Sequence, residues 1–97
     1  MNGETIRRKV TITNPQGLHI RPASAFAQLA GKFQSRVTVW KDTQGVNGRS
    51  PLELLLLAAL PGTELIVEVS GEDAETALEA LAILLAAPGA EDAAEES

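Results

Sequence analysis

The sequence has no cysteine and no tyrosine, and its 97 residues include one histidine, one tryptophan and two phenylalanines. Without cysteine the chain forms neither disulfides nor thiolate metal sites, which fits a reducing compartment. Aromatic residues make up 3% of the chain and hydrophobic residues 44%, so we expect a mainly aliphatic core. The length fits one small domain, which we place at residues 1–89.

Long apolar runs are also absent. The most apolar run, residues 52–60, is much shorter than the roughly 20 residues that a membrane-spanning helix needs. No apolar segment follows the basic residues near the N-terminus, so no secretory signal is visible. We therefore expect a soluble, cytoplasmic protein without a membrane partner.

Basic residues are missing from the second half of the chain. All 8 Lys and Arg residues lie within residues 1–50, where only Glu4 and Asp42 oppose them, and residues 51–97 hold the other 11 acids. The net charge of −5 disfavours general nucleic-acid binding. An electropositive first half would attract anions and acidic partners, unless folding mixes the two halves and blurs the difference.

Hydrophobic periodicity and turn residues divide the chain into seven elements. The expected strands are residues 5–13, 35–41, 46–49 and 63–70, and the expected helices run from Pro22, over 51–60 and over 72–87. A hairpin turn is expected at residues 42–45. In the first helix, Phe26, Ala30 and Phe33 predict one buried face, while Arg8 interrupts the apolar face of the first strand.

The resulting order, β-α-β-β-α-β-α, predicts an α+β fold. Because the strands alternate apolar and polar residues, we expect helices to cover one face of the sheet and water the other. The last residues, 90–97, are small and acidic, so we expect a flexible tail there.

The stretch GLHIRPAS, residues 17–24, places the only histidine between a glycine loop and a helix start. A neutral imidazole such as that of His19 is a nucleophile near neutral pH. A helix N-terminus is a natural anion site, and Arg21 adds a planar cation suited to phosphate oxygens. Gly17 lets the loop backbone approach closely. Together these features predict a site that carries a phosphoryl group on nitrogen.

Other uses of His19 have less support among the residues. A metal site needs several ligands, and the chain has no second histidine and no cysteine, so we expect neither metal nor cofactor. A nucleophilic pair of His19 with Ser24 or Ser50 stays open on spacing, although no motif supports it. The plainer alternative is a loop histidine that only caps a helix.

Four segments of the sequence match one known family. They are GLHIRPA at residues 17–23, Val46-Asn47 ahead of Ser50, PGTEL at residues 61–65 and SGEDA at residues 70–74. From about Thr5 to Ala87 the chain resembles HPr, the histidine-containing phosphocarrier of the bacterial phosphoenolpyruvate-dependent phosphotransferase system. The resemblance implies an open-faced β-sandwich with a four-stranded antiparallel sheet and three helices on one face. Ile20 stands where the family usually has alanine.

The resemblance also implies a function. Enzyme I would phosphorylate His19 on Nδ1, and Arg21 would steady the phosphoryl group beside the Gly17 loop. The group would pass to an A-type enzyme II component, in a sugar-related or nitrogen-related branch of the system. The chain would then be a relay and not an independent catalyst. Because a carrier must expose its site to two partners in turn, we expect a monomer.

The segment Ser50-Pro51-Leu52-Glu53 predicts a capping box at a helix start. In Gram-positive members of the family, the serine matching Ser50 is a regulatory phosphorylation site, which implies an HPr kinase as a further partner. Here Pro51 follows the serine, where the family usually has an aliphatic residue. That difference disfavours recognition by the kinase, so helix capping alone is the competing interpretation of Ser50.

Residues 52–60 are apolar on nearly every side of the expected helix, so some of these leucines are expected to face water. We expect partners to dock on Ile20, Leu52, Leu55 and Leu56, unless the leucines are all covered by the core. An alternative function follows from this surface: a regulatory docking module in which Ser50 and the leucine helix are the control surface. A small-molecule-binding domain has only fold-level analogy in its favour.

Overall fold

The computed structural model describes residues 4–86 of the chain. The tail expected at residues 90–97 and the domain boundary expected at residue 89 lie outside this range. The elements are β1 (Glu4–Thr11), α1 (Ile20–Ala30), β2 (Arg36–Lys41), β3 (Gln44–Asn47), α2 (Pro51–Leu56), β4 (Glu64–Gly71) and α3 (Ala74–Ala86). Their order is the one that the hydrophobic pattern predicts.

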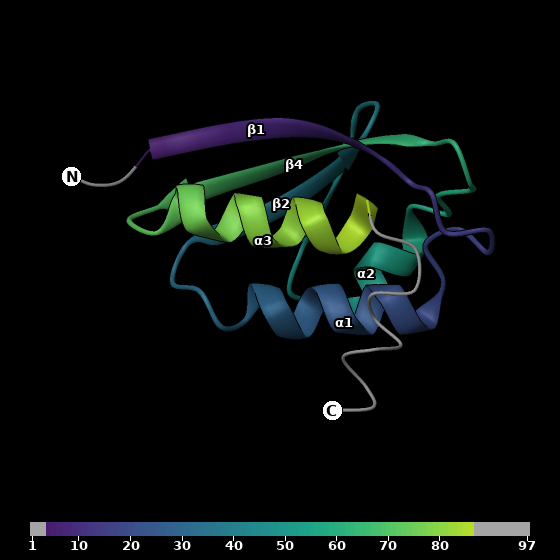
Figure 1. The fold of residues 1–97 in the computed structure, drawn as a ribbon, viewed down its shortest axis with the longest axis horizontal. Coiled ribbons are helices and arrows are strands. Elements are labelled where there is room, and N and C mark those ends of the chain that lie inside the picture. Colours follow the sequence, from purple (N-terminus) through teal and green to yellow (C-terminus); the bar gives the residue numbers. More distant parts are fainter. Residues whose placement is uncertain (1–3, 87–97) are drawn as a thin grey trace.

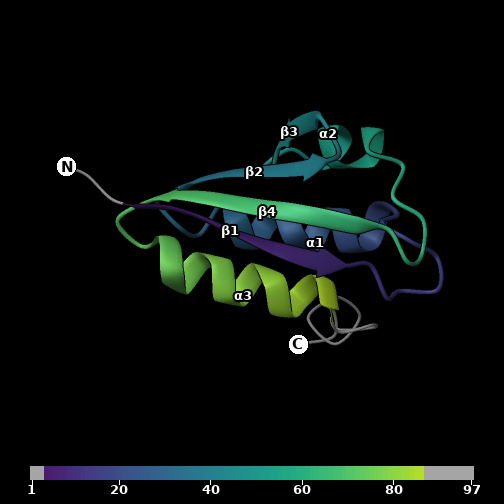
Figure 2. The same ribbon diagram turned by 90° about the horizontal axis from the view of Figure 1, so that it is seen from above.

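The four strands form one antiparallel sheet in the order β1-β4-β2-β3. The three helices lie on one face of this sheet and leave the other face open (Figure 1). Viewed from above, β4 runs through the middle of the molecule between β1 and β2 (Figure 2). The expected open-faced sandwich is therefore confirmed.

The core fills the space between the sheet and the helices. Alternate residues of the strands point inward because side chains of a strand alternate between its two faces. The buried side chains include Val10, Val37, Val39, Leu65, Val67 and Val69 from the sheet, and Phe26, Ala30, Leu54, Leu78 and Leu81 from the helices. The core is thus almost wholly aliphatic, with Phe26 as its buried aromatic residue among those described.

Arg8 breaks the apolar pattern of β1 because β1 is an edge strand. Its guanidinium lies on the helix side of the sheet and makes a 3.4 Å ion pair with Glu79 of α3. An inward-pointing charge on an edge strand also discourages pairing with other chains.

Several boundaries differ from the expected ones. α1 begins at Ile20, so Pro22 is the third residue of the helix and not the first. α1 ends at Ala30, and Phe33 packs against the core from the following loop. Glu72 precedes α3, which begins at Ala74.

The hairpin turn is also shorter than expected. It consists of Asp42 and Thr43, because Lys41 and Gln44 already pair across the strands. Trp40 pairs with Gly45, and an added Cβ on this glycine would lie 2.8 Å from the indole ring. Gly45 therefore leaves room for the Trp40 ring within the strand pair. The residue of the turn with a left-handed backbone is Asp42, with φ at 55°.

The leucine helix is the largest departure from the sequence prediction. α2 ends at Leu56, whereas the pattern predicted a helix to residue 60. Its last amides bond three residues back, from Leu57 to Leu54 and from Ala58 to Leu55. Ala58 then takes a left-handed conformation with φ at 49°. The turn buries both Leu57 and Ala59, which a continuous helix would not place in the core together.

Candidate functional site

The loop before α1 is held tightly by its backbone. Gly17 has φ at 72°, and its N–H donates to the Asn14 carbonyl at 2.8 Å. The Leu18 N–H donates to the Ala59 carbonyl, also at 2.8 Å. A Cβ on residue 17 would lie 2.5 Å from the same Ala59 oxygen, so the position accepts only glycine without a shift. The loop and the chain after α2 are thus fixed to each other.

His19 is the residue that precedes the first turn of α1. Its backbone is extended, with φ at −93° and ψ at −169°, and its carbonyl accepts the first helical hydrogen bond from Ala23 at 3.0 Å. The imidazole is half-buried and makes no capping hydrogen bond. The alternative in which His19 only caps the helix is therefore wrong for its side chain.

Arg21 lies in the first turn of α1 and is exposed. A helix start carries partial positive charge from backbone N–H groups that lack intrahelical acceptors. Pro22 removes one of these donors, so the Arg21 guanidinium supplies the strongest positive charge of this turn. The site combines a nucleophilic ring, a cation and a close backbone loop within residues 17–21.

Ser50 caps α2, as the sequence predicts. Its hydroxyl accepts from the Glu53 N–H at 3.2 Å. The expected capping box is not closed, because the Glu53 carboxylate accepts from the Asn47 N–H at 2.9 Å and not from Ser50. The Ser50 N–H instead donates to the Asn47 carbonyl at 3.1 Å. Ser50 is half-buried, and its hydroxyl oxygen accepts the capping hydrogen bond of α2. In this structure the Ser50 side chain therefore stabilises the start of α2.

Large apolar side chains are exposed around the site. Ile20 of α1 is 53% exposed, and Leu52 and Leu56 of α2 are 74% and 67% exposed. Leu60, in the segment after α2, is 70% exposed and was not among the expected docking residues. Leu55 differs from the others, because it is half-buried against the core. We call Ile20, Leu52, Leu56 and Leu60 the apolar patch.

Two residues that support the site carry no signal in the sequence. The Lys41 ammonium, at the end of β2, donates to the Leu57 carbonyl at 3.1 Å and so holds the end of α2. Ala58 makes the left-handed turn that leads to the Ala59 carbonyl, which bonds Leu18. A glycine at residue 58 would have marked this turn, but an alanine does not.

Serine partners for His19 were left open by the sequence. Ser50 has its oxygen engaged in the cap of α2, and Ser24 is a half-buried residue within α1. No side-chain hydrogen bond between either serine and His19 is seen among residues 4–86.

Within residues 4–86 there is no group of three or more histidine or carboxylate side chains placed to hold a metal ion. In the same stretch of chain, no helix is long and apolar enough to cross a membrane.

Comparisons with known proteins agree with this architecture. A family model described as "PTS HPr component phosphorylation site" matches residues 6–87. The phosphocarrier protein HPr of Xylella fastidiosa is 39% identical over 79 residues, covering 81% of this chain and 89% of that protein. The HPr-like protein Crh of Bacillus subtilis is 42% identical over 77 residues, covering 79% of this chain and 91% of that protein.

The solved structures give the same result. A crystal structure of HPr from Bacillus anthracis aligns with a TM-score of 0.80 at 34% identity, over 84% of this chain and 96% of that one. The family match, the curated relatives and the shared fold lead to one conclusion: the chain belongs to the HPr family of phosphocarrier proteins of the phosphotransferase system.

Proposed function

We propose that the protein accepts a phosphoryl group on His19 from phosphorylated enzyme I and passes it to an A-type enzyme II component. The observation that carries this proposal is the His19 ring, which stands at a helix start without a capping bond and beside Arg21. A histidine whose role was to cap α1 would have its ring bonded to a backbone N–H of the first turn. The phosphoryl group would come from phosphoenolpyruvate through enzyme I.

The proposed transfer needs little from this chain beyond position and charge. The lone pair of Nδ1 attacks phosphorus, an N–P bond forms, and the bond between phosphorus and the donor group breaks. The attack requires an unprotonated Nδ1, so the reacting form is the neutral ring with its proton on Nε2. The second transfer reverses these steps, with the acceptor's nucleophile attacking and His19 leaving. The chain acts as a relay, and its partners supply the remaining catalytic groups.

Arg21 and Gly17 have distinct roles in this proposal. The Arg21 guanidinium offers N–H donors in a planar fork that suits phosphoryl oxygens. Gly17, by contrast, acts through the backbone, since its conformation and its contact with Ala59 fix the loop that carries His19. Removing Arg21 should weaken the hold on the phosphoryl group, whereas changing Gly17 should displace the ring.

The apolar patch supports the proposed docking of enzyme I and the acceptor. Ile20 is adjacent to His19 in the chain, and Leu52 and Leu56 lie on α2, whose following segment bonds the His19 loop. Exposed apolar groups beside a transfer site fit a surface that partners cover in turn. Leu55, also expected as a docking residue, packs against the core and is not part of the patch. We place the carrier in the cytoplasm and expect a monomer, since the site must be open to both partners.

A second candidate is the regulatory docking module. The observation in its favour is the similarity to Crh of Bacillus subtilis, which one solved structure describes as a catabolite repression HPr. Under this alternative, Ser50 and α2 form the control surface and His19 is dispensable. An unchanged biological output in His19→Ala would favour docking over transfer.

The test of the carrier proposal is incubation with enzyme I, Mg²⁺ and labelled phosphoenolpyruvate. We expect a label that is lost in acid and stable in alkali, as phosphohistidine is. The label should disappear in His19→Ala and remain in Lys32→Ala, which removes an exposed charge elsewhere. A wild-type chain that stays unlabelled with enzyme I from several species would overturn the proposal.

A further inference from the structure

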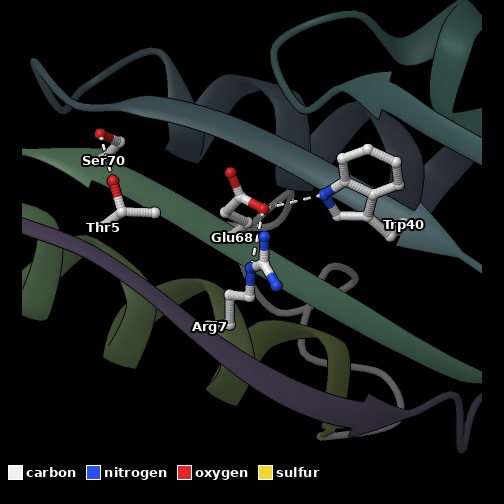
Figure 3. A network of polar contacts seen from close by, with 5 residues as sticks. All are labelled: Thr5, Arg7, Trp40, Glu68 and Ser70. Carbon is white, nitrogen blue, oxygen red and sulfur yellow. Dashed lines mark hydrogen bonds and ion pairs between the residues drawn. The ribbon is translucent and has the colours of Figure 1, made fainter.

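The open face of the sheet holds a network of hydrogen-bonded side chains at its centre. The Glu68 carboxylate accepts from Arg7 Nε at 2.9 Å and from Trp40 Nε1 at 3.1 Å, so three neighbouring strands meet on one carboxylate (Figure 3). Beside it, the hydroxyls of Thr5 and Ser70 are 2.9 Å apart. Because Arg7 and Glu68 neutralise each other, this central network leaves no net charge.

Two other arginines lie at the end of the same face without a carboxylate partner. The ion pairs among residues 4–86 use Arg7, Arg8 and Lys9, and none uses Arg36 or Arg49. Arg36 is on the open face, because its neighbour Val37 is buried on the helix face. The chain has a net charge of −5, yet these two arginines together make this end of the face locally positive.

The backbone brings these two arginines together. Arg36 pairs with Ser70 of β4, and β2 extends beyond β3 at this point. The vacant side of β2 is taken by the segment after β3, where the Gly48 N–H donates to the Val37 carbonyl at 2.8 Å. A Cβ on Gly48 would lie 2.4 Å from the Val37 side chain, so the glycine permits this close approach. Arg49 is the next residue.

The side chain of Arg49 is held in a fixed position. One guanidinium nitrogen donates to the Phe33 and Ser35 carbonyls at 2.6 and 2.9 Å. Its backbone N–H donates to the Asn47 side chain at 2.9 Å. A guanidinium fixed in this way loses little conformational freedom when its remaining N–H groups bind a ligand.

A hollow of about 820 Å³ lies between these residues, which we call the polar hollow. The polar residues that line it are Gln34, Arg36, Thr38, Asn47, Arg49 and Ser70. These are two guanidinium, two amide and two hydroxyl residues, and no acid is among the described residues that line the hollow. Its volume falls within the range of small-molecule sites, and its donors suit an anion with several oxygens.

We propose that the polar hollow binds a phosphate-bearing small molecule. A phosphate ester offers three terminal oxygens to two arginines and neutral donors, whereas a carboxylate offers two oxygens. The hollow is on the open face of the sheet, whereas the apolar patch lies on α1, on α2 and on the segment that follows α2. A ligand in the hollow and a partner on the patch would therefore not compete for the same surface. The proposal does not depend on phosphoryl transfer by His19.

The experiment titrates inorganic phosphate and pyrophosphate, at constant ionic strength, into the ¹⁵N-labelled chain. Backbone amide shifts locate the binding, and Trp40, the single tryptophan of the chain, reports it by fluorescence from the same face. We expect saturable shifts at residues 34–38, 47–49 and 70. Shifts confined to residues 17–21 would place the anion at the His19 site and overturn the proposal.

Charge-matched variants separate a site from general attraction. Arg36→Gln removes one guanidinium from the hollow, and Lys32→Gln removes a charge from an exposed position outside it. Because a charge-assisted hydrogen bond contributes roughly a factor of ten or more, we expect about tenfold weaker pyrophosphate binding in Arg36→Gln. Lys32→Gln should bind as the wild type does.

Two results would contradict this assignment. Equal weakening in both variants would show that only net charge matters. Binding of a polyglutamate peptide at the hollow, without binding of pyrophosphate, would assign the surface to an acidic protein partner instead. Unfolding curves for both variants check that the fold is intact, which is expected because Lys32 and Arg36 are exposed and lie outside the core.

Discussion

Gly17 is held in a left-handed conformation against the Ala59 carbonyl, which makes it the strictest position of the His19 loop. We expect Gly17→Ala to lower the free energy of unfolding by about 2 kcal/mol, from backbone strain and the new contact. Gly31→Ala is the matched control, because Gly31 is right-handed and an added Cβ meets only ordinary contacts. Urea unfolding measures both, and equal losses would contradict the prediction.

Ser50 contributes to stability whether or not a kinase recognises it. Loss of its capping oxygen in Ser50→Ala should cost about 1 kcal/mol, while Ser50→Asp should keep most of that stability. Thermal or urea unfolding of the two variants distinguishes the outcomes. A loss as large in Ser50→Asp as in Ser50→Ala would show that the hydroxyl contact is not the source of the effect.

Phosphorylation of Ser50 would modify the same oxygen that caps α2. Incubation with an HPr kinase and ATP, followed by intact-mass measurement, tests it. Since Pro51 follows the serine and the side chain is half-buried, we expect no added phosphate. One added phosphate that is lost in Ser50→Ala would restore the regulatory interpretation.

At the scale of elements, the end of α2 is the segment that holds the His19 loop in place. Ala58 is strained there, so Ala58→Gly should raise the free energy of unfolding by about 1 kcal/mol. The same exchange in the middle of α3, Ala80→Gly, should lower it by about 1 kcal/mol. Opposite signs in urea unfolding are the expected result, and two losses would show that Ala58 is unstrained.

The order of the elements follows from local patterns in the sequence, whereas the end of α2 does not. The elements, their order and the positions of Gly17, His19 and Arg21 were predictable, because periodicity and turn residues act locally. The end of α2 was not, since burial of Leu57 and Ala59 overrides a sequence that favours a longer helix. The contact of Lys41 with α2 depends on pairing between distant segments, which leaves no local pattern.

At the scale of the whole molecule, Asp73 ties the loop after α1 to the start of α3. Its carboxylate accepts hydrogen bonds from the Ser35 hydroxyl and from the Gln34 and Ser35 N–H groups. The Ser35 hydroxyl, followed by the Gln34 N–H, lowers the pKa of Asp73 below its ordinary value of 3.8. The folded state therefore favours the ionised carboxylate.

This shift predicts how stability depends on pH. The contribution of Asp73 is complete above pH 3.8 and is lost as the pH falls through the lower pKa of the folded state. We expect Asp73→Asn to lower stability at neutral pH and to weaken its fall toward acid, as measured by urea unfolding from pH 7 to pH 2. Asp42→Asn, in the exposed hairpin turn, is the control. An unchanged acid slope in Asp73→Asn would contradict the assignment.

The two halves of the chain, which differ so strongly in charge, are mixed by the fold. Arg7, Arg8 and Lys9 of β1 pair with Glu68, Glu79 and Glu64 from the second half. The electropositive first half therefore does not survive as a single surface, and the polar hollow is one local exception to this neutralisation. Exposed pairs of this kind add little stability individually, so their main effect is on the surface potential.

The strand order β1-β4-β2-β3 has a consequence for biosynthesis. β4 occupies a central place in the sheet, yet the ribosome makes it after the other three strands. Until residues 64–71 have left the ribosome, β1 has no partner strand, and β2 pairs only with β3. The basic strand β1 therefore stays unpaired in the nascent chain until β4 is available. When β4 completes the sheet, its Glu64 and Glu68 also neutralise Lys9 and Arg7 of β1. Sheet formation in this protein is a late and nearly single event in its synthesis.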